Sequence, residues 1–159
     1  MDILNADYWD SRYQTSQTGW DIGYPSPAIV SYFERLKDKN SALLIPGCGN
    51  AYEGEAIHNM GFTNLTLLDY AENSKRNFLE RVSGFSENNF ITGDFFEHKG
   101  SYDIIVEQTF FCALNPDLRS MYVDSMHELL APGGKIVGLM FNIPLFEDHP
   151  PFGGNETDY

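Results

Sequence analysis

Short apolar runs alternate with segments of helical periodicity along most of this chain, and that alternation constrains the fold more than any other feature. Runs typical of buried strands cover residues 42–45, 65–69, 89–92, 102–106 and 135–141. Apolar residues at helical spacing predict helices over residues 26–37, 52–60, 72–82 and 115–130. Strands joined by helices in this order form right-handed crossovers between parallel neighbours. We therefore predict an α/β fold with a doubly wound, mostly parallel sheet.

A length of 159 residues suits a single compact domain. We expect a Rossmann-like core over residues 26–159, preceded by an N-terminal cap over residues 1–25. The cap shows no sustained helical or strand period, and its aromatic residues are Tyr8, Trp9, Tyr13, Trp20 and Tyr24. Such a segment is expected to cover something on the core.

Composition excludes several classes of partner. A formal net charge of −13 disfavours nucleic acid, because phosphate backbones require clustered Lys and Arg. A small neutral or cationic ligand fits this charge better, although an acidic surface also serves solubility. Cys48 and Cys112 have neither metal-site spacing nor a disulfide framework, so we expect reduced thiols and no metal. The acidic N-terminus and the lack of a long apolar stretch predict a soluble, cytoplasmic protein without a membrane partner.

Ligands of doubly wound sheets bind beyond the carboxyl ends of the strands, where the winding direction reverses. Gly47 and Gly49 follow the first predicted strand, where their backbone can approach a ligand closely and present amides at a helix N-terminus. A dinucleotide fingerprint would require glycine at Tyr52, and a P-loop is absent. Asp69 ends the second strand, where an acid can accept both ribose hydroxyls. An adenosine ligand without a pyrophosphate, S-adenosylmethionine, meets this description.

Other residues suit the same ligand. Asp94 ends the third strand and is expected to bind the adenine amino group, while Phe95 packs on the ring. The sulfonium is a cation and aromatic faces attract cations, which favours Trp9, Tyr13 and Trp20 as its cover. Structural alternatives stay open: Asp69 can cap the next helix, Asp94 can be a turn residue, and the aromatics can simply pack on the core.

The sequence assigns no catalytic residue. Glu107 ends the fourth strand and would add negative charge near the transferred methyl, or it is structural, capping or pairing. No nucleophile and base stand at a recognisable spacing, and four scattered histidines are interpreted as surface or packing residues: His58, His98, His127 and His149. A methyl sulfonium already carries a good leaving group, so transfer needs mainly in-line positioning and exclusion of water.

A set of motifs in this order resembles the thiopurine S-methyltransferase family. The resemblance is closer to its branch of thiol and halide methyltransferases, often called harmless-to-ozone-layer proteins. Its carriers run from Tyr8 to Phe152: Trp9, residues 18–23 (Thr-Gly-Trp-Asp-Ile-Gly), residues 44–49 (Leu-Ile-Pro-Gly-Cys-Gly), Leu68-Asp69, residues 93–96 (Gly-Asp-Phe-Phe), residues 109–114 (Thr-Phe-Phe-Cys-Ala-Leu), residues 132–134 (Pro-Gly-Gly) and residues 150–152 (Pro-Pro-Phe).

The resemblance implies a Rossmann-like, S-adenosylmethionine-dependent enzyme that methylates soft nucleophiles: thiols, bisulfide, thiocyanate, halides or aromatic thiols. It also implies cofactor contacts from Trp9, Tyr13, Trp20, Gly47, Asp69, Asp94, Phe95 and Gln108. Tyr13 stands where many relatives have Trp, and Gln108 stands where plant relatives have Tyr. An apolar lining desolvates a polarizable anion, so the expected acceptor wall consists of Phe110, Phe111, Pro151 and Phe152.

Members of this family continue beyond the Pro-Pro-aromatic loop with a helix and two strands that complete a seven-stranded sheet. This sequence stops at Tyr159. We expect a truncated product or a short form whose fifth strand is apolar enough to be buried yet lies at an uncovered edge, prone to self-association. Three other readings stay open: methylation of oxygen, nitrogen or carbon with a general base near Glu107, a non-catalytic S-adenosylmethionine-binding module, and, disfavoured by Tyr52, a nicotinamide-dependent oxidoreductase.

Overall fold

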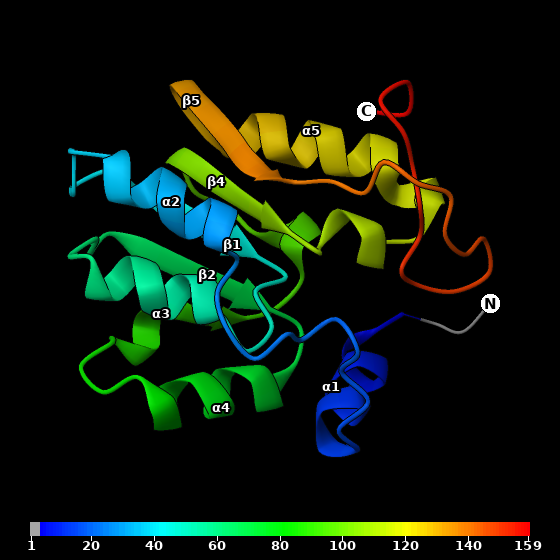
Figure 1. The fold of residues 1–159 in the computed structure, drawn as a ribbon, viewed down its shortest axis with the longest axis horizontal. Coiled ribbons are helices and arrows are strands. Elements are labelled where there is room, and N and C mark those ends of the chain that lie inside the picture. The colour runs from blue at the N-terminus through cyan, green and yellow to red at the C-terminus, as the bar shows by residue number, and fades with distance from the viewer. Residues whose placement is uncertain (1–3) are drawn as a thin grey trace.

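One parallel sheet of five strands, in the order β3-β2-β1-β4-β5, forms the centre of the computed structural model, which describes residues 4–159 (Figure 1). The strands are β1 (Leu43–Pro46), β2 (Leu65–Asp69), β3 (Phe90–Thr92), β4 (Tyr102–Gln108) and β5 (Leu130–Leu139). From β1 the order runs outward to β3 on one side and to β5 on the other, so the winding reverses between β1 and β4. The predicted doubly wound α/β fold is confirmed.

Helices cover both faces of the sheet. The main helices are α2 (Pro27–Arg35), α3 (Tyr52–Asn59), α4 (Glu72–Arg81) and α5 (Arg119–Leu129). Short 3₁₀ turns lie at Glu87–Asn89, Phe95–Glu97, Phe111–Ala113 and Pro116–Leu118. None of the helices within residues 4–159 has the length and hydrophobicity needed to cross a bilayer.

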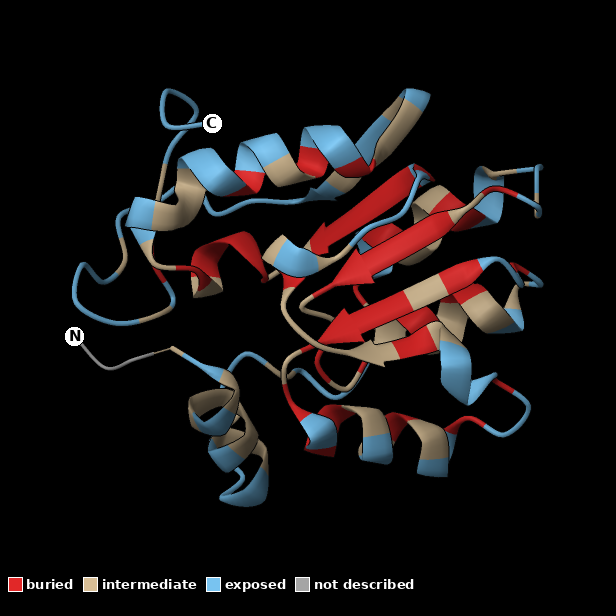
Figure 2. Cartoon of the chain, turned by 180° about the vertical axis from the view of Figure 1, so that it is seen from behind, coloured by how far each residue is buried: buried red, intermediate tan, exposed pale blue. Residues whose placement is uncertain are grey.

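Two core clusters separate on the two faces because successive side chains of a strand point in opposite directions. Leu43 and Ile45 pack with α2, α3 and α4, whereas Leu44 packs in the cluster that contains Tyr122 and Met126 of α5. All residues of β1 are buried, and Figure 2 shows the central strands as the most buried part of the chain. Burial on both faces explains why these strands have unbroken apolar sequences.

The fifth strand differs from its prediction. It begins at Leu130 and ends at Leu139, and its pairing with β4 is irregular between Tyr102 and Ile104. Its apolar side chains are partly uncovered, as expected for an edge: Ile136 and Leu139 are 44% and 49% exposed. The sheet order explains this exposure, because β5 is an edge strand with β4 as its only neighbour in the sheet.

The N-terminal segment has no sustained period in its sequence, yet part of it is helical. A helix, α1 (Ala6–Gln14), begins at the N-cap Asn5, whose side chain accepts a hydrogen bond from the Tyr8 amide. Asp10 then ties α1 to α4 by accepting hydrogen bonds from the Asn73 amide at 2.9 Å and the Asn73 side chain at 2.6 Å. None of the α1 residues is fully buried, so the helix has no apolar stripe to reveal it.

Candidate active site

The turn after β1 lies at the carboxyl edge of the sheet, which is the edge where all five strands end. Gly47 and Gly49 adopt left-handed backbone conformations, with φ of 56° and 55°. A Cβ atom at Gly47 would overlap the Phe110 ring, and one at Gly49 would lie 2.7 Å from Tyr13 Oη. Both positions therefore need glycine, for conformation and for space.

Asp69 joins this turn to the start of α4. Its carboxylate accepts hydrogen bonds from the Gly49 amide at 2.7 Å and the Ala71 amide at 2.9 Å, and the side chain is 8% exposed. Burial raises the pKa of Asp69, and the bonds from Ala71 and Gly49 oppose that rise. Asp69 therefore makes the contact at the start of α4 that the structural alternative expects. It also lies against the glycine turn. The ribose contact stays a prediction.

Asp94 and Phe95 lie beyond β3. Asp94 accepts a hydrogen bond from the Phe96 amide at 2.8 Å and so caps the 3₁₀ turn that follows. The Phe95 ring is 4% exposed and packs 5.1 Å from the Phe110 ring, between centroids. Asp94 is therefore a turn residue, as the structural alternative expects. The adenine contacts of Asp94 and Phe95 stay predictions.

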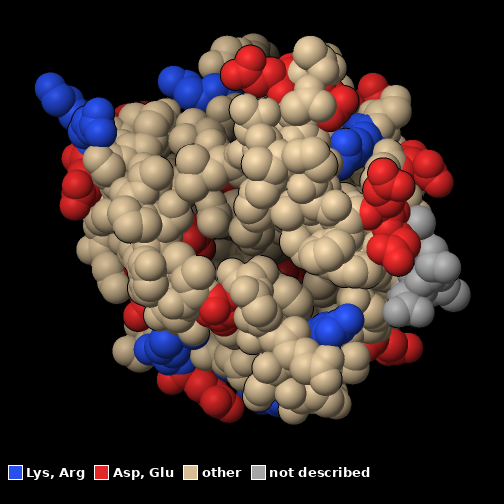
Figure 3. Space-filling view, turned by 45° about the vertical axis from the view of Figure 1, so that its right-hand side comes forward, with Lys and Arg blue, Asp and Glu red and all other residues tan. Residues whose placement is uncertain are grey.

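Aromatic side chains of the N-terminal segment gather near the same edge. The Trp20 ring lies 5.4 Å from Trp9 and 6.0 Å from Tyr13, between centroids. Burial, followed by the charge of Asp69, raises the pKa of the Tyr13 hydroxyl. Asp21 and the Asn50 side chain, 2.5 Å apart, tie the loop carrying Trp20 to the glycine turn. Figure 3 shows this side of the molecule hollowed, with acidic atoms at the bottom of the hollow.

The end of β4 is organised by a buried acid. Glu107 is 2% exposed and accepts hydrogen bonds from the amides of Phe110 and Phe111 at 2.9 and 3.0 Å and from the Tyr122 hydroxyl at 2.7 Å. Burial raises the pKa of Glu107, against the effect of these donors. The next residue, Gln108, has a buried side-chain oxygen without a hydrogen-bond partner among the described residues. Such an orphaned acceptor fits contact with a ligand donor.

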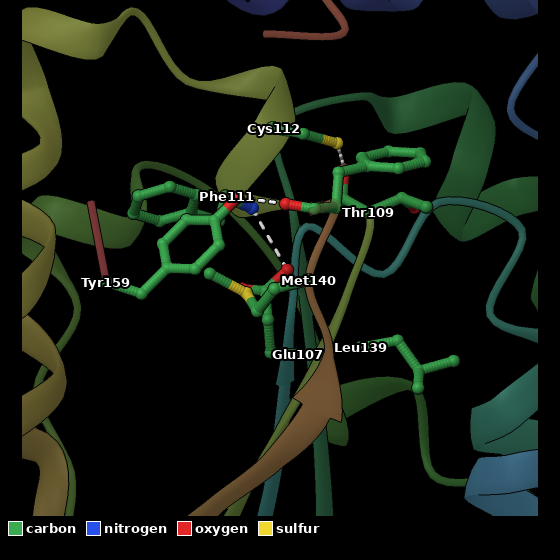
Figure 4. Close-up of a pocket in the computed structure, with 8 residues that line it drawn as sticks. Glu107, Thr109, Phe111, Cys112, Leu139, Met140 and Tyr159 are labelled. Carbon is green, nitrogen blue, oxygen red and sulfur yellow. Dashed lines mark hydrogen bonds between the residues drawn. The ribbon is translucent and has the colours of Figure 1, made fainter. Parts of the chain in front are cut away.

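A narrow pocket lies between the turn after β4 and the segment after β5. Its lining residues are Glu107, Thr109, Phe111, Cys112, Leu139, Met140, Phe141 and Tyr159. Figure 4 shows these side chains around the pocket, with hydrogen bonds linking Glu107 to Phe111 and Cys112 to Thr109. The free space is that of roughly one water-sized group.

Of the predicted acceptor wall, only Phe111 lines this pocket. Phe110 packs against Gly47, and Pro151 is exposed. Phe152 is 1% exposed, and its amide donates to the Cys112 carbonyl at 2.6 Å. The sequence prediction missed the apolar residues at the end of β5, Leu139, Met140 and Phe141. Their place after a strand, at the edge where ligands bind, was the available signal.

Comparison with known proteins decides the family. Residues 4–158 match the thiopurine S-methyltransferase family, nearly the whole chain. The chain belongs to this family. The resemblance inferred from the motifs is thereby confirmed, including its thiol methyltransferase branch, since one relative named a probable thiol methyltransferase and two named thiocyanate methyltransferases match most of the chain.

Two relatives and one solved structure illustrate the likeness of this thiopurine S-methyltransferase family member. It is 32% identical to probable thiol methyltransferase 2 of Arabidopsis thaliana, covering 95% of this chain and 69% of the relative. It is 30% identical to thiocyanate methyltransferase 1 of the same plant, covering 91% and 65%. Magnesium protoporphyrin IX methyltransferase of Synechocystis PCC 6803 has a similar fold, with a TM-score of 0.76 at 13% identity, covering 96% and 83%. The chain thus spans about two thirds of the length of the two plant relatives.

Proposed function

We propose that this family member is an enzyme that transfers the methyl group of S-adenosylmethionine to a small soft nucleophile such as a thiol, bisulfide, thiocyanate or halide. The observation that carries the proposal is membership of the thiopurine S-methyltransferase family across residues 4–158. The names of the two plant relatives, a thiol and a thiocyanate methyltransferase, support the acceptor class.

The carboxyl edge fits the cofactor. Gly47 and Gly49 let Phe110 and Tyr13 pack directly on the backbone of the turn, and the unpaired Gln108 oxygen offers an acceptor at the neighbouring strand end. Asp69 would hold the ribose, Asp94 and Phe95 the adenine, and Trp9, Tyr13 and Trp20 would cover the sulfonium. When bound, the cofactor supplies an activated methyl group with a good leaving group. The protein then needs to align the acceptor and exclude water.

The pocket favours a small acceptor that needs no general base. Its apolar lining would desolvate a polarizable anion, which strengthens the nucleophile. Its narrow space favours a small nucleophile over an aromatic thiol. Glu107 faces this pocket, but its oxygens are already occupied by three donors, so it is poorly placed to take a proton from an acceptor. This argues against methylation of oxygen, nitrogen or carbon with Glu107 as base.

Headspace analysis tests the proposal directly. The protein, incubated with S-adenosylmethionine and with iodide or bisulfide, is expected to release methyl iodide or methanethiol. Calorimetry with S-adenosylhomocysteine measures cofactor binding separately. Binding without release of either product would contradict the enzyme proposal and identify a non-catalytic binding module. Absence of binding would remove the cofactor assignment as well.

We further propose that the protein works in the cytoplasm on a small molecule, without nucleic acid, membrane or metal partners. The free thiols of Cys48 and Cys112 support a reducing compartment. Fluorescence microscopy of a tagged protein tests the location.

A further inference from the structure

The turn after β4 contains a strained residue. Thr109 has a φ of 58°, in the left-handed region that a β-branched side chain rarely adopts. Such a conformation persists only where surrounding contacts hold it. Glu107 supplies those contacts, because one of its oxygens accepts from both amides that follow Thr109, those of Phe110 and Phe111.

The other oxygen of Glu107 is held by α5. The Tyr122 hydroxyl donates to it at 2.7 Å, and the Tyr122 ring packs 5.0 Å from the Phe111 ring, between centroids. Glu107 and Tyr122 are both buried. The bond therefore links the strained turn to a helix whose position is set by the core.

This turn has contacts on two sides of the proposed active site. Phe110 packs against Gly47 of the cofactor turn, at a distance that only glycine permits. Phe111 and Cys112 line the acceptor pocket, and the Cys112 carbonyl binds the Phe152 amide. A shift of the turn would therefore change the placement of the acceptor relative to the cofactor.

We propose that Glu107 and Tyr122 are positioning residues for methyl transfer: their buried bond fixes the turn over residues 108–111 between the cofactor turn and the acceptor pocket. This role rests on the proposed function. It differs from an electrostatic role of Glu107, because the hydrogen-bond geometry matters and the charge does not. In-line transfer is sensitive to small errors in placement, so loss of the bond lowers the rate more than cofactor affinity.

Three variants separate position from charge and from general stability. Tyr122→Phe removes the bond and keeps the ring. Glu107→Gln removes the charge, yet its amide oxygen can accept from Phe110 and Phe111 while its NH₂ group donates to the Tyr122 oxygen. The matched control is Tyr102→Phe, which removes the hydroxyl of another buried tyrosine, bonded to His98 at 2.7 Å at the other end of β4.

Methyl transfer and S-adenosylhomocysteine binding are measured for each variant. Tyr122→Phe is expected to lower kcat by about tenfold, the effect of losing one buried hydrogen bond, with little change in the Kd of S-adenosylhomocysteine. Glu107→Gln should lose less of kcat than Tyr122→Phe, because it keeps the bonds to the turn, and Tyr102→Phe should retain most of kcat. An equal loss in Glu107→Gln would show that the charge matters and would overturn the proposal, as would an unaffected Tyr122→Phe.

Amide hydrogen exchange keeps this test independent of turnover. Without any ligand, the Phe110 and Phe111 amides should exchange about tenfold faster in Tyr122→Phe than in the wild type or in Tyr102→Phe, because the acceptor is no longer held. If the wild type transfers no methyl group, the proposed function fails. The exchange rates alone then test whether the Tyr122 bond holds the turn. Unchanged exchange in Tyr122→Phe would then overturn the positioning role.

Discussion

Asp69 is the residue on which the cofactor assignment depends most, since it touches the glycine turn and ends the strand next to β1. We expect Asp69→Asn to weaken S-adenosylhomocysteine binding by at least about tenfold, because an amide cannot accept from both ribose hydroxyls as a carboxylate can. Calorimetry measures the Kd.

Asp38 provides a matched control for this substitution. Asp38 is exposed and, like Asp69, accepts a hydrogen bond from the amide two residues later, at 3.0 Å from Asn40. Asp38→Asn should therefore leave the Kd unchanged. If Asp69→Asn binds as tightly as this control, Asp69 is not part of the cofactor site.

The raised pKa of Glu107 gives a stability prediction with a definite sign. Because burial raises the pKa, the folded protein holds this proton more tightly than the unfolded chain, whose glutamate has a pKa of about 4.3. The resulting stability is complete below that value and is lost as the pH rises through the raised folded pKa. Glu107→Gln has no such titration, so it should gain stability relative to the wild type as the pH rises.

Urea unfolding at a series of pH values from acid to neutral measures that difference in the free energy of unfolding. A difference that stays constant with pH, or that shrinks, would mean that the Glu107 pKa is not raised in the folded protein.

At the scale of elements, α1 and the loop after it are expected to close the site. The segment is held to the core by polar contacts, Asp10 to Asn73 and Asp21 to Asn50, and it brings Trp20 beside Tyr13. We predict that S-adenosylhomocysteine shifts the Trp fluorescence and slows proteolysis within residues 4–25.

Asp10→Ala should weaken this protection, because it removes the bonds between α1 and α4. Asp7→Ala provides the control, since Asp7 lies exposed in the first turn of the same helix. Equal cleavage rates with and without ligand in the wild type would favour simple packing of the segment over closure.

At the scale of the whole molecule, the edge of the sheet is an exposed apolar surface. Ile136 of β5 and Ile143 and Phe146 beyond it are between 44% and 50% exposed. An uncovered edge strand presents unpaired backbone groups beside these side chains, a combination that favours pairing with another chain. We predict that the protein self-associates in solution. Light scattering measures this association.

Ile136→Lys should reduce this association, because a charged side chain on an edge strand opposes pairing. Val123→Lys is the control, since Val123 is 60% exposed but lies on helix α5 and not on an edge strand. A wild type that is monodisperse, or an equal response to both substitutions, would contradict the prediction.

Local patterns in the sequence were enough to predict the sheet, its main helices and the carboxyl edge. Strand β2 has the predicted bounds, and the starts of α3 and α4 coincide with those predicted. Caps, glycine stops and apolar periodicity act over a few residues, so their effect is readable without knowledge of the fold. Gly47 and Asp69 were found by the same reasoning, because topology places every strand end at one edge.

Contacts between distant segments were decided by the tertiary structure. Helix α1 was missed because its partner residue, Asn73, lies 63 positions from Asp10 and leaves no local period. The pocket joins the turn after β4 to Leu139, Met140 and Tyr159, a grouping that depends on β5 lying beside β4. For Glu107, the sequence left charge and structure equally open, and Tyr122 could be recognised as its partner only once α5 packed on the sheet. Periodicity records which face of an element is buried, but which surface it meets depends on the packing of the whole chain.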